Sequence, residues 1–514
     1  MTPARAPARS AFAVAVLPLL ALLATGSASE AANGPMPSTV GTRGPIAMPM
    51  DGDGQTMFRM PSGIGWSLES RIDLDVFIAM TYAEMRNRLN DFDERSFTPG
   101  LSGGVVFAPG RPTWEELDEE AADLEAGITP TRKRSPLEDF SFGFGVYVDV
   151  AGGGGDADKL RLTTYPETVG VRKGITFITS QLTTAWTPTK WLSIGLGVNL
   201  IYAELSLRSL VGGDSTPLGG SPTINGVPIP GNPTYGDFLA LFANDGDEDP
   251  TTFFKGRLSA IQYSGILSAT LRPGERFALG LSYRERSWAP EPFEGEATID
   301  ASKTFSQALG GLDPAIQSLF LATLPNGGSR GFTASYDAEI EKLHVPRQVR
   351  LSLAGWPTDR LLLGAEVAWI EWHRAFGSTK VTLEDGDNTD LNFVTGSTSI
   401  NSDLASRWKN RWIFSAYAAF GITDDVTLRA GASYGKSPFN TKTQEGLPSA
   451  GFAALNFSLG AGWRLTDHLE LLTLLEYAPP TTAKTGQEAK SLTAKDSKYV
   501  SEQAFIHLGL TYRF

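Results

Sequence analysis

The chain of 514 residues contains no cysteine, only four histidines and an excess of acidic residues. Without cysteine it can hold no disulfide framework, no thiolate metal site and no thiol nucleophile. The formal net charge of −13 argues against a nucleic-acid partner, because such proteins present a basic surface. Beyond the N-terminal segment no run of roughly 18 apolar residues occurs, so the sequence predicts no later transmembrane helix.

Sequence motifs of known catalytic sites are scarce as well. No HExxH, P-loop or GxSxG motif occurs in a fitting context. A barrel-type outer-membrane lipase would need a Ser–His pair on its lipid face, but His507 falls on the opposite face by its phase. The acidic runs 51–54 and 385–388 lack the ligand at about position twelve of a calcium loop, so we interpret them as polar turns. We therefore expect no enzyme, no cofactor and no metal site.

What the sequence does contain is alternation with period two, the side-chain period of a β-strand. It is clearest at residues 504–514, where apolar positions ending in Tyr512 and Phe514 alternate with small or polar ones. Such an aromatic edge promotes aggregation in a soluble sheet, although it could still close a soluble β-domain. A barrel in lipid pairs it with the first strand. The ending is similar to the C-terminal signal of bacterial outer-membrane barrels, so Tyr512 and Phe514 are the expected signal for the barrel assembly machinery.

Residues 1–32 have the pattern of a secretory signal peptide. Arg5 and Arg9 give a positive start, an apolar run follows at 11–25, and small residues near 26–29 offer cleavage sites. The apolar run is too short for a membrane anchor and contains Pro18. We expect export to the envelope of a Gram-negative bacterium.

Residues 33–65 are rich in Gly, Pro and Met and show no clear periodicity. They are too apolar for a solvated linker, so we expect a hatch that plugs the lumen of a larger structure; a flexible leader is the alternative. Methionine adapts to varied apolar shapes. The candidate substrate-binding residues of this segment are Met48, Met57, Phe58 and Met60.

Alternating segments then recur through residues 66–514. The first, beginning near Leu68, places Asp73 and Asp75 on one face and apolar residues on the other, as expected for a wet lumen and a lipid face. Tight turns alternate with long connections, which is the plan of an outer-membrane barrel. With 331–356 counted as one strand kinked at Pro346, the sequence predicts an all-β fold, a fourteen-stranded antiparallel transmembrane β-barrel. The expected lumen charges are Glu69, Arg71, Asp73, Asp75, Arg350, Glu366, Arg429, Arg464 and Arg513.

Three connections carry more than turn residues. Residues 111–138 form an acidic segment of helical character, interpreted as a periplasmic insertion. The long extracellular loops 208–257 and 300–330 both contain apolar clusters. These clusters could pack together as a small extracellular core or form an entry surface for an apolar ligand. Their candidate substrate-binding residues are Phe238, Leu239, Phe242, Leu319 and Phe320.

Taken in order, several stretches of the second half are similar to one known family. They are residues 272–284, 293–297, 345–351, 356–361, 422–434 and 437–438. With these stretches the chain resembles the FadL/TodX family of outer-membrane transporters for hydrophobic compounds. The resemblance implies a barrel closed by an N-terminal hatch, and substrate that passes from an extracellular site to an inner pocket and then sideways into the bilayer. The Asn-Pro-Ala motif of the family's hatch corresponds here to Met60, Pro61, Ser62 and Gly63, in which only the proline is kept.

The expected function is passive uptake of long-chain fatty acids or aromatic hydrocarbons across the outer membrane. The alternative is a structural or adhesive barrel whose long loops bind partners. Expected partners are the hydrophobic molecule, outer-membrane lipid and lipopolysaccharide, and the assembly machinery. Gly143 and Gly145 would weaken or kink their strand and are the candidate lateral opening. We also expect Arg513 to contact Glu69 or Asp73 where the last strand meets the first.

Overall fold

The computed structural model describes thirteen stretches of the chain. The predicted signal peptide, the hatch before Thr56 and residues 111–136 of the acidic insertion lie outside them. The described residues are 56–67, 69–109, 137–162, 165–211, 220–224, 227–235, 237, 252–274, 276–376, 379–404, 408–438, 454–486 and 496–514.

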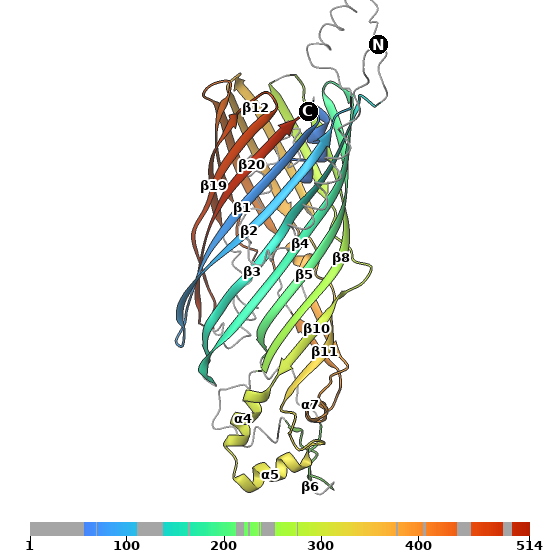
Figure 1. Cartoon of the computed structure of the whole chain (residues 1–514), viewed down its shortest axis with the longest axis vertical. Helices are drawn as coiled ribbons and strands as arrows, with labels where there is room; N and C mark the ends of the chain where they lie inside the picture. The colour runs from blue at the N-terminus through green and yellow to red at the C-terminus, as the bar shows by residue number, and fades with distance from the viewer. Residues whose placement is uncertain are drawn as a thin grey trace, which may run out of the picture.

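Fourteen antiparallel strands pair in a closed ring, as the sequence predicts (Figure 1). No helix among the described residues is long and apolar enough to cross a membrane. In ring order the strands are β1 (Arg71–Arg86), β2 (Asp91–Phe107), β3 (Phe140–Leu162), β4 (Tyr165–Thr189), β5 (Leu192–Val211), β8 (Thr252–Leu271), β9 (Phe277–Arg284), β12 (Gln348–Thr358), β13 (Leu361–Ile370), β16 (Arg411–Gly421), β17 (Val426–Tyr434), β18 (Leu455–Arg464), β19 (Leu469–Lys484) and β20 (Lys498–Arg513).

The alternation along β5 shows why this sequence closes around a polar lumen. Leu196 and Val198 are half exposed on the outer face, whereas Ser193 and Asn199 are fully buried on the inner face. Outer apolar side chains face lipid, and inner polar ones find partners in the lumen. The chain enters and leaves the barrel at the end with the tight turns, which is the periplasmic end of such barrels.

The last strand closes the ring as expected. β20 pairs with β1 from Arg71↔Arg513 to Arg86↔Lys498. Nδ1 of His507 lies 3.1 Å from Oδ2 of Asp75, so the polar faces of the two strands do meet. The expected contact of Arg513 is wrong: its Nη2 lies 2.5 Å from Oε2 of Glu470 on β19.

Asp73 is occupied by two closer donors. Nη2 of Arg71 lies 2.6 Å from its Oδ1, and the Thr511 hydroxyl donates to the same oxygen at 2.6 Å. Arg71 stands on the same face two residues before Asp73, so it reaches the carboxylate without crossing to another strand.

At the other end of the barrel, a four-stranded extension continues the wall beyond β8. Short irregular segments separate β10 from β9 and β11 from β12, and the expected kink at Pro346 is a full interruption between Ile340 and Gln348. Proline offers no N–H to a ladder, which suits it to such a break. The extension consists of β10 (Phe293–Asp300), β11 (Thr333–Ile340), β14 (Thr379–Glu384) and β15 (Ile400–Leu404), with α6 (Trp372–Ala375) at the break.

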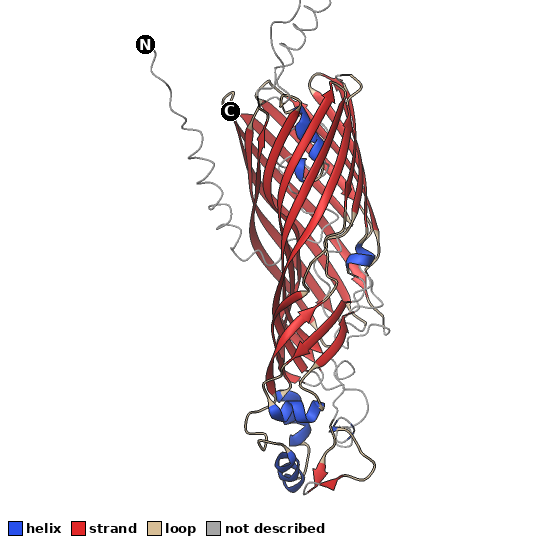
Figure 2. Cartoon of the chain, turned by 90° about the vertical axis from the view of Figure 1, so that its right-hand side faces the viewer, coloured by secondary structure: helices blue, strands red, loops and turns tan. Residues whose placement is uncertain are grey.

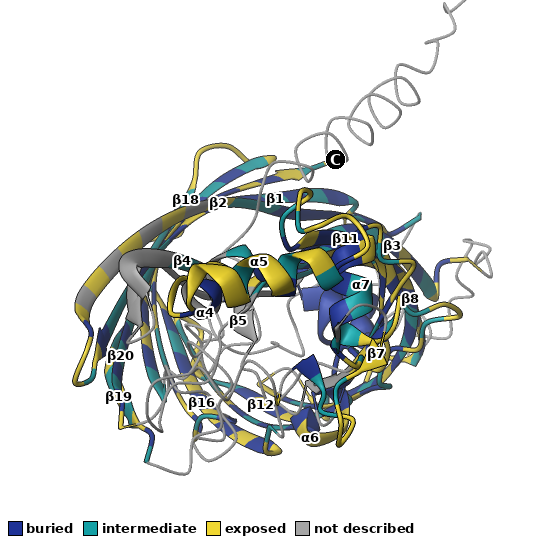
Figure 3. Cartoon of the chain, turned by 90° about the horizontal axis from the view of Figure 1, so that it is seen from below, coloured by how far each residue is buried: buried dark blue, intermediate teal, exposed yellow. Residues whose placement is uncertain are grey.

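Helices cap this extracellular end and lie within the outline of the barrel when seen along its axis (Figure 3). Phe305 stacks on Phe332 with ring centroids 3.8 Å apart, and Phe320 meets Tyr235 edge-on at 5.6 Å. Burial raises the pKa of Tyr336 in the same core to about 12. The elements are α4 (Ser302–Gly310), α5 (Pro314–Thr323), α7 (Thr389–Thr395) and the hairpin β6 (Thr223–Ile224) and β7 (Val227–Pro228).

Candidate functional site

The hatch lies inside the barrel near the end that carries the C-terminus (Figure 2). It consists of two 3-10 turns, η1 (Thr56–Phe58) and η2 (Pro61–Trp66), and every residue from Thr56 to Trp66 is buried. Pro61 occupies the first turn of η2, where its missing N–H costs nothing. A buried backbone of this irregular kind needs partners for its N–H and C=O groups outside itself.

Those partners are side chains of β4, β5, β8 and β9. The N–H of Ser62 donates to Oγ of Ser268 at 2.7 Å, and its carbonyl accepts from Oγ of Ser193 at 2.8 Å. We call this side of the hatch the bonded side. Its further bonds run from Gln181 Nε2 to the Met57 carbonyl (2.7 Å), from Thr187 Oγ1 to the Gly65 carbonyl (3.0 Å), from Ser282 Oγ to the Arg59 carbonyl (2.6 Å), and between the hydroxyls of Ser62 and Thr270 (2.7 Å).

Close approach on the bonded side requires a glycine at position 195. A Cβ added to Gly195 would stand 2.1 Å from the backbone nitrogen of Ser62 and 2.4 Å from the carbonyl carbon of Pro61. Backbone atoms cannot give way as the end of a side chain can. The absence of a side chain at Gly195 therefore allows η2 to pack directly against β5.

The opposite side of the hatch makes apolar contacts with β2 and β3. The ring of Phe58 lies 4.4 Å from that of Tyr147 on β3, and Met57 and Ile64 pack with Val106 of β2 in the same cluster. We call this the apolar side.

Gly143 and Gly145, the expected lateral opening, lie on this apolar side. A Cβ at Gly143 would stand 2.5 Å from Sδ of Met57, and one at Gly145 would stand 2.7 Å from Cε of the same residue. Both glycines fall within the paired part of β3; Gly143 makes room for Met57, and Gly145 makes room for Tyr147 and Met57. Whether substrate leaves beside them stays a prediction.

The wall itself changes just beyond these glycines. β1 pairs with β2 along their full lengths, from Arg71↔Val106 to Arg86↔Asp91. β2 pairs with β3 only from Phe107↔Phe142 to Gly103↔Val146, and within the described residues the two strands share no further pairing. Beyond Val146, β3 pairs with β4 alone. The β2–β3 boundary is thus the part of the ring with the shortest ladder.

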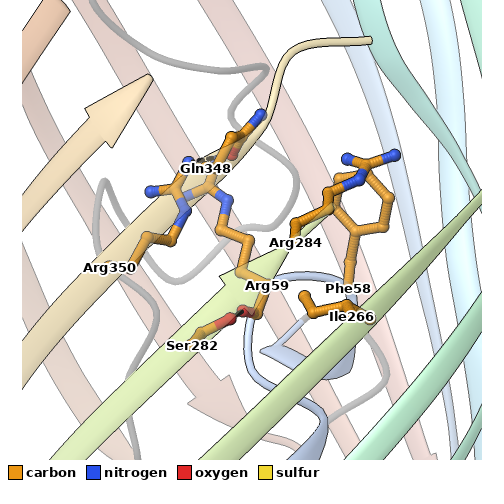
Figure 4. A pocket seen from close by; sticks show the side chains of 7 residues that line it. All are labelled: Phe58, Arg59, Ile266, Ser282, Arg284, Gln348 and Arg350. Atoms are coloured by element: carbon orange, nitrogen blue, oxygen red, sulfur yellow. Dashed lines mark hydrogen bonds between the residues drawn. The ribbon is translucent and has the colours of Figure 1, made fainter. Parts of the chain in front are cut away.

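A small cavity of about 10 Å³ lies on the bonded side next to the hatch (Figure 4). Of the described residues that line it, three are arginines and none is acidic. Arg284 stacks over the ring of Phe58 at 5.1 Å. Nη1 of Arg350 lies 2.6 Å from Oε1 of Glu366 on β13, and its Nη2 donates to Gln348 at 2.9 Å. The lining residues are Phe58, Arg59, Ile266, Ser282, Arg284, Gln348 and Arg350.

The remaining candidate residues are spread over the molecule. Phe320 is buried in the extracellular core, which fits the small-core alternative, while Leu319 is exposed beside it. Tyr512 and Phe514 are half exposed on the outer face near the periplasmic end, where an assembly signal would be accessible. Met48, Phe238, Leu239 and Phe242 lie outside the described residues. Among the described residues, the sequence-derived set comes together at Met57, Phe58, Met60, Pro61, Ser62 and Gly63, with Gly143 and Gly145 placed against Met57.

Several residues that build the site escaped the sequence analysis. Arg284 ends β9 and Arg59 belongs to the hatch, and neither stands out in a pattern of period two. The signal that could have found the wall residues is their inward phase, which Ser193, Ser268 and Ser282 share with ordinary lumen residues. Nothing in the chain alone indicates that these hydroxyls bind the hatch rather than water.

A family model described as "Outer membrane protein transport protein (OMPP1/FadL/TodX)" matches residues 124–514. The chain belongs to this family. The fold, with its hatch and fourteen strands, agrees with that membership and with a location in the outer membrane. The sequence-based expectation of an outer-membrane transport barrel is thereby confirmed.

Solved structures share the fold at low sequence identity. The toluene transporter TbuX of Ralstonia pickettii has 13% identity and a TM-score of 0.60, with 95% of this chain and 99% of that chain covered. The toluene transporter TodX of Pseudomonas putida has 14% identity and a TM-score of 0.62, with 95% of this chain and 100% of that chain covered. A FadL homologue of Pseudomonas aeruginosa has 14% identity and a TM-score of 0.61, with 95% of this chain and 98% of that chain covered. No curated protein matches the sequence.

Proposed function

We propose that the protein is a passive uptake channel for hydrophobic molecules that carry a carboxylate, such as long-chain fatty acids. The observation that carries this proposal is the pocket beside the hatch, which Arg59, Arg284 and Arg350 line together and in which Arg284 stacks over the ring of Phe58. Guanidinium groups bind carboxylates through paired, charge-assisted hydrogen bonds. The hydroxyl of Ser282 and the amide of Gln348 add polar groups to the same pocket.

The tail of such a molecule finds apolar surface next to the head group. Ile266 lines the pocket, and Phe58 joins it to the cluster of Met57, Ile64 and Tyr147. An elongated amphipathic ligand would therefore lie with its head among the arginines and its tail toward the apolar side of the hatch. A neutral aromatic hydrocarbon, the cargo named for two of the structural relatives, has no carboxylate for these guanidinium groups to bind.

Release follows from the asymmetry of the wall. The apolar side of the hatch faces the β2–β3 boundary, where the ladder is shortest. An apolar molecule that leaves there enters lipid and never has to cross water. This path needs no cofactor, no metal and no chemical step, so the proposal is a transporter and not an enzyme.

Uptake assays with two substrates separate the alternatives. Cells that lack their own transporter would express the wild type, Arg284→Gln and Arg350→Gln, and would receive radiolabelled oleate or an alkylbenzene. We expect oleate uptake to fall about tenfold in each variant, since a charged hydrogen bond contributes about 1.5–3 kcal/mol. Alkylbenzene uptake should stay as it was.

The control is Arg276→Gln, which removes an exposed arginine at a periplasmic turn, far from the pocket. Equal loss of both substrates in the pocket variants would point to misfolding. Unchanged oleate uptake would contradict the carboxylate proposal. If the wild type takes up neither substrate, the structural or adhesive alternative replaces transport.

A further inference from the structure

The outer face of β5 changes character along its length. From the periplasmic end it presents Ile194, Leu196, Val198 and Leu200, then Tyr202. Aromatic residues of this kind mark the level at which an outer-membrane barrel leaves the hydrocarbon. The next outward positions are Glu204, Ser206 and Arg208, so β5 runs on into the head-group region and beyond.

Cations gather at this level on two neighbouring strands. Arg208 of β5 pairs in register with Lys255 of β8, and both side chains are exposed. Arg257 of β8 follows two residues later, and its side chain is 76% exposed. Arg172 of β4 occupies the register position opposite Arg208. We call Arg208, Lys255 and Arg257 the basic patch.

Within the described residues, only Arg257 of the patch is paired with an acidic side chain. Arg257 donates from Nε and Nη2 to the two carboxylate oxygens of Glu204, both at 3.1 Å, and Glu204 also accepts from the hydroxyl of Tyr202. Arg208 and Lys255 have no ion pair and no side-chain hydrogen bond within the described part of the chain. Like charges directly opposite each other on one face of a sheet destabilise it. An external anion would remove that cost.

The surroundings restrict where such an anion can lie. On the far side of β8, β10 and β11 carry carboxylates in register, Glu294 opposite Glu339 and Glu296 opposite Asp337. An anionic head group is repelled from these strands and attracted to β5 and β8. The patch continues directly from the lipid-facing surface, which makes a membrane lipid a nearer occupant than a soluble molecule.

We propose that the basic patch binds the phosphate groups of the glycolipid in the outer leaflet, lipopolysaccharide. Arg208 and Lys255 would hold phosphate oxygens between them, while the acyl chains lie against Val198, Leu200 and Tyr202 below. Clusters of Lys and Arg beside an apolar belt bind anionic lipid head groups in this way. The contact would fix the barrel's orientation in the leaflet at the β5–β8 side and would not depend on the transported substrate.

Binding of purified rough-type lipopolysaccharide to the full chain in detergent tests the proposal. For Arg208→Gln/Lys255→Gln we expect roughly 30-fold weaker binding, because each cation near an anionic lipid surface contributes on the order of 1 kcal/mol. The same lipid after dephosphorylation should bind the wild type about as weakly. Native mass spectrometry counts the bound lipid, and a heat-shifted band on a gel confirms that each variant is folded.

Two matched variants complete the design. Arg276→Gln/Arg360→Gln removes two exposed arginines at periplasmic turns and should leave binding unchanged. Glu294→Gln/Glu339→Gln removes the neighbouring repulsion and should strengthen binding. Equal binding of wild type and Arg208→Gln/Lys255→Gln would overturn the proposal. So would equal binding of the dephosphorylated lipid, or full displacement of the lipid by inorganic phosphate at low millimolar concentration.

Discussion

The two sides of the hatch meet two different kinds of wall. On the bonded side, Ser193, Ser268 and Gln181 bind its backbone from strands that pair over long ladders. On the apolar side, Met57 packs against β3 where the β2–β3 ladder is shortest. Hydrogen bonds have fixed directions, whereas apolar contacts can slide. This difference supports our proposal that the hatch is held mainly from the bonded side and that substrate passes along the apolar side.

The largest effect should come from blocking the bonded side. Gly195→Leu drives a side chain into the backbone of Ser62, and overpacking of this kind costs about 1–3 kcal/mol or more. We expect about 100-fold more chains with an unseated hatch. Entry of a large hydrophilic antibiotic into cells measures it. The control is Gly265→Leu, whose added Cβ meets nothing closer than 3.9 Å; a barrier equally intact in both variants would refute the seat on β5.

Removing two hydrogen bonds should have the next largest effect. The absence of native cysteine allows a single reporter, Met60→Cys, in the buried hatch. Ser193→Ala/Ser268→Ala removes about 2 kcal/mol of hydrogen bonding, so maleimide should label the reporter roughly 30-fold faster. Ser433→Ala/Ser458→Ala, buried hydroxyls of β17 and β18, is the control. Equal labelling in both would show that the serines do not hold the hatch.

A substitution on the apolar side should change the rate of oleate uptake more than it changes how firmly the hatch is held in the barrel. Gly143→Leu fills the space beside Met57 and should reduce oleate uptake about tenfold, as expected for 1–2 kcal/mol of crowding. Labelling of the reporter at position 60 should change little, because every hydrogen bond of the bonded side remains. Full oleate uptake in this variant would contradict a substrate path along β3.

The smallest effect comes from one bond at the end of the hatch. Thr187→Val removes the hydrogen bond to the carbonyl of Gly65 and keeps the volume of the side chain. We expect about fivefold faster labelling at position 60, since one neutral hydrogen bond contributes about 1 kcal/mol. An unchanged labelling rate would mean that η2 does not depend on this contact. A larger increase in labelling than that of Ser193→Ala/Ser268→Ala would mean that Thr187 holds the hatch more strongly than the two serines do.

The sequence was sufficient to predict the barrel because lipid-facing and lumen-facing side chains alternate along each strand. Val76 and Ile78 against Asp73 and Asp75 already show it, and the structure exposes the first pair and buries the second. The closing pair of strands followed from the terminal alternation. The partner of Arg513 did not, because Glu470 and Asp73 both lie on neighbouring strands and only the register decides between them.

The site was less accessible to sequence reasoning. The hatch could be recognised as apolar, and Met57, Phe58 and Met60 are indeed buried within it. Its seat depends on inward hydroxyls that resemble any residues of a wet lumen. Arg284 and Arg350 come together from β9 and β12, which are far apart in the chain and adjacent only once the extension between them has folded out of the ring.

Joining β2 to β3 tests most directly whether substrate leaves at their boundary. Leu101→Cys/Val148→Cys places thiols at positions that would lie opposite each other if the pairing of Gly103 with Val146 continued. Linked by a short bis-maleimide, this protein should lose oleate uptake down to background, while Leu182→Cys/Val198→Cys, linked across the continuous β4–β5 ladder, should retain it. Full uptake by the β2–β3-linked protein would contradict lateral release.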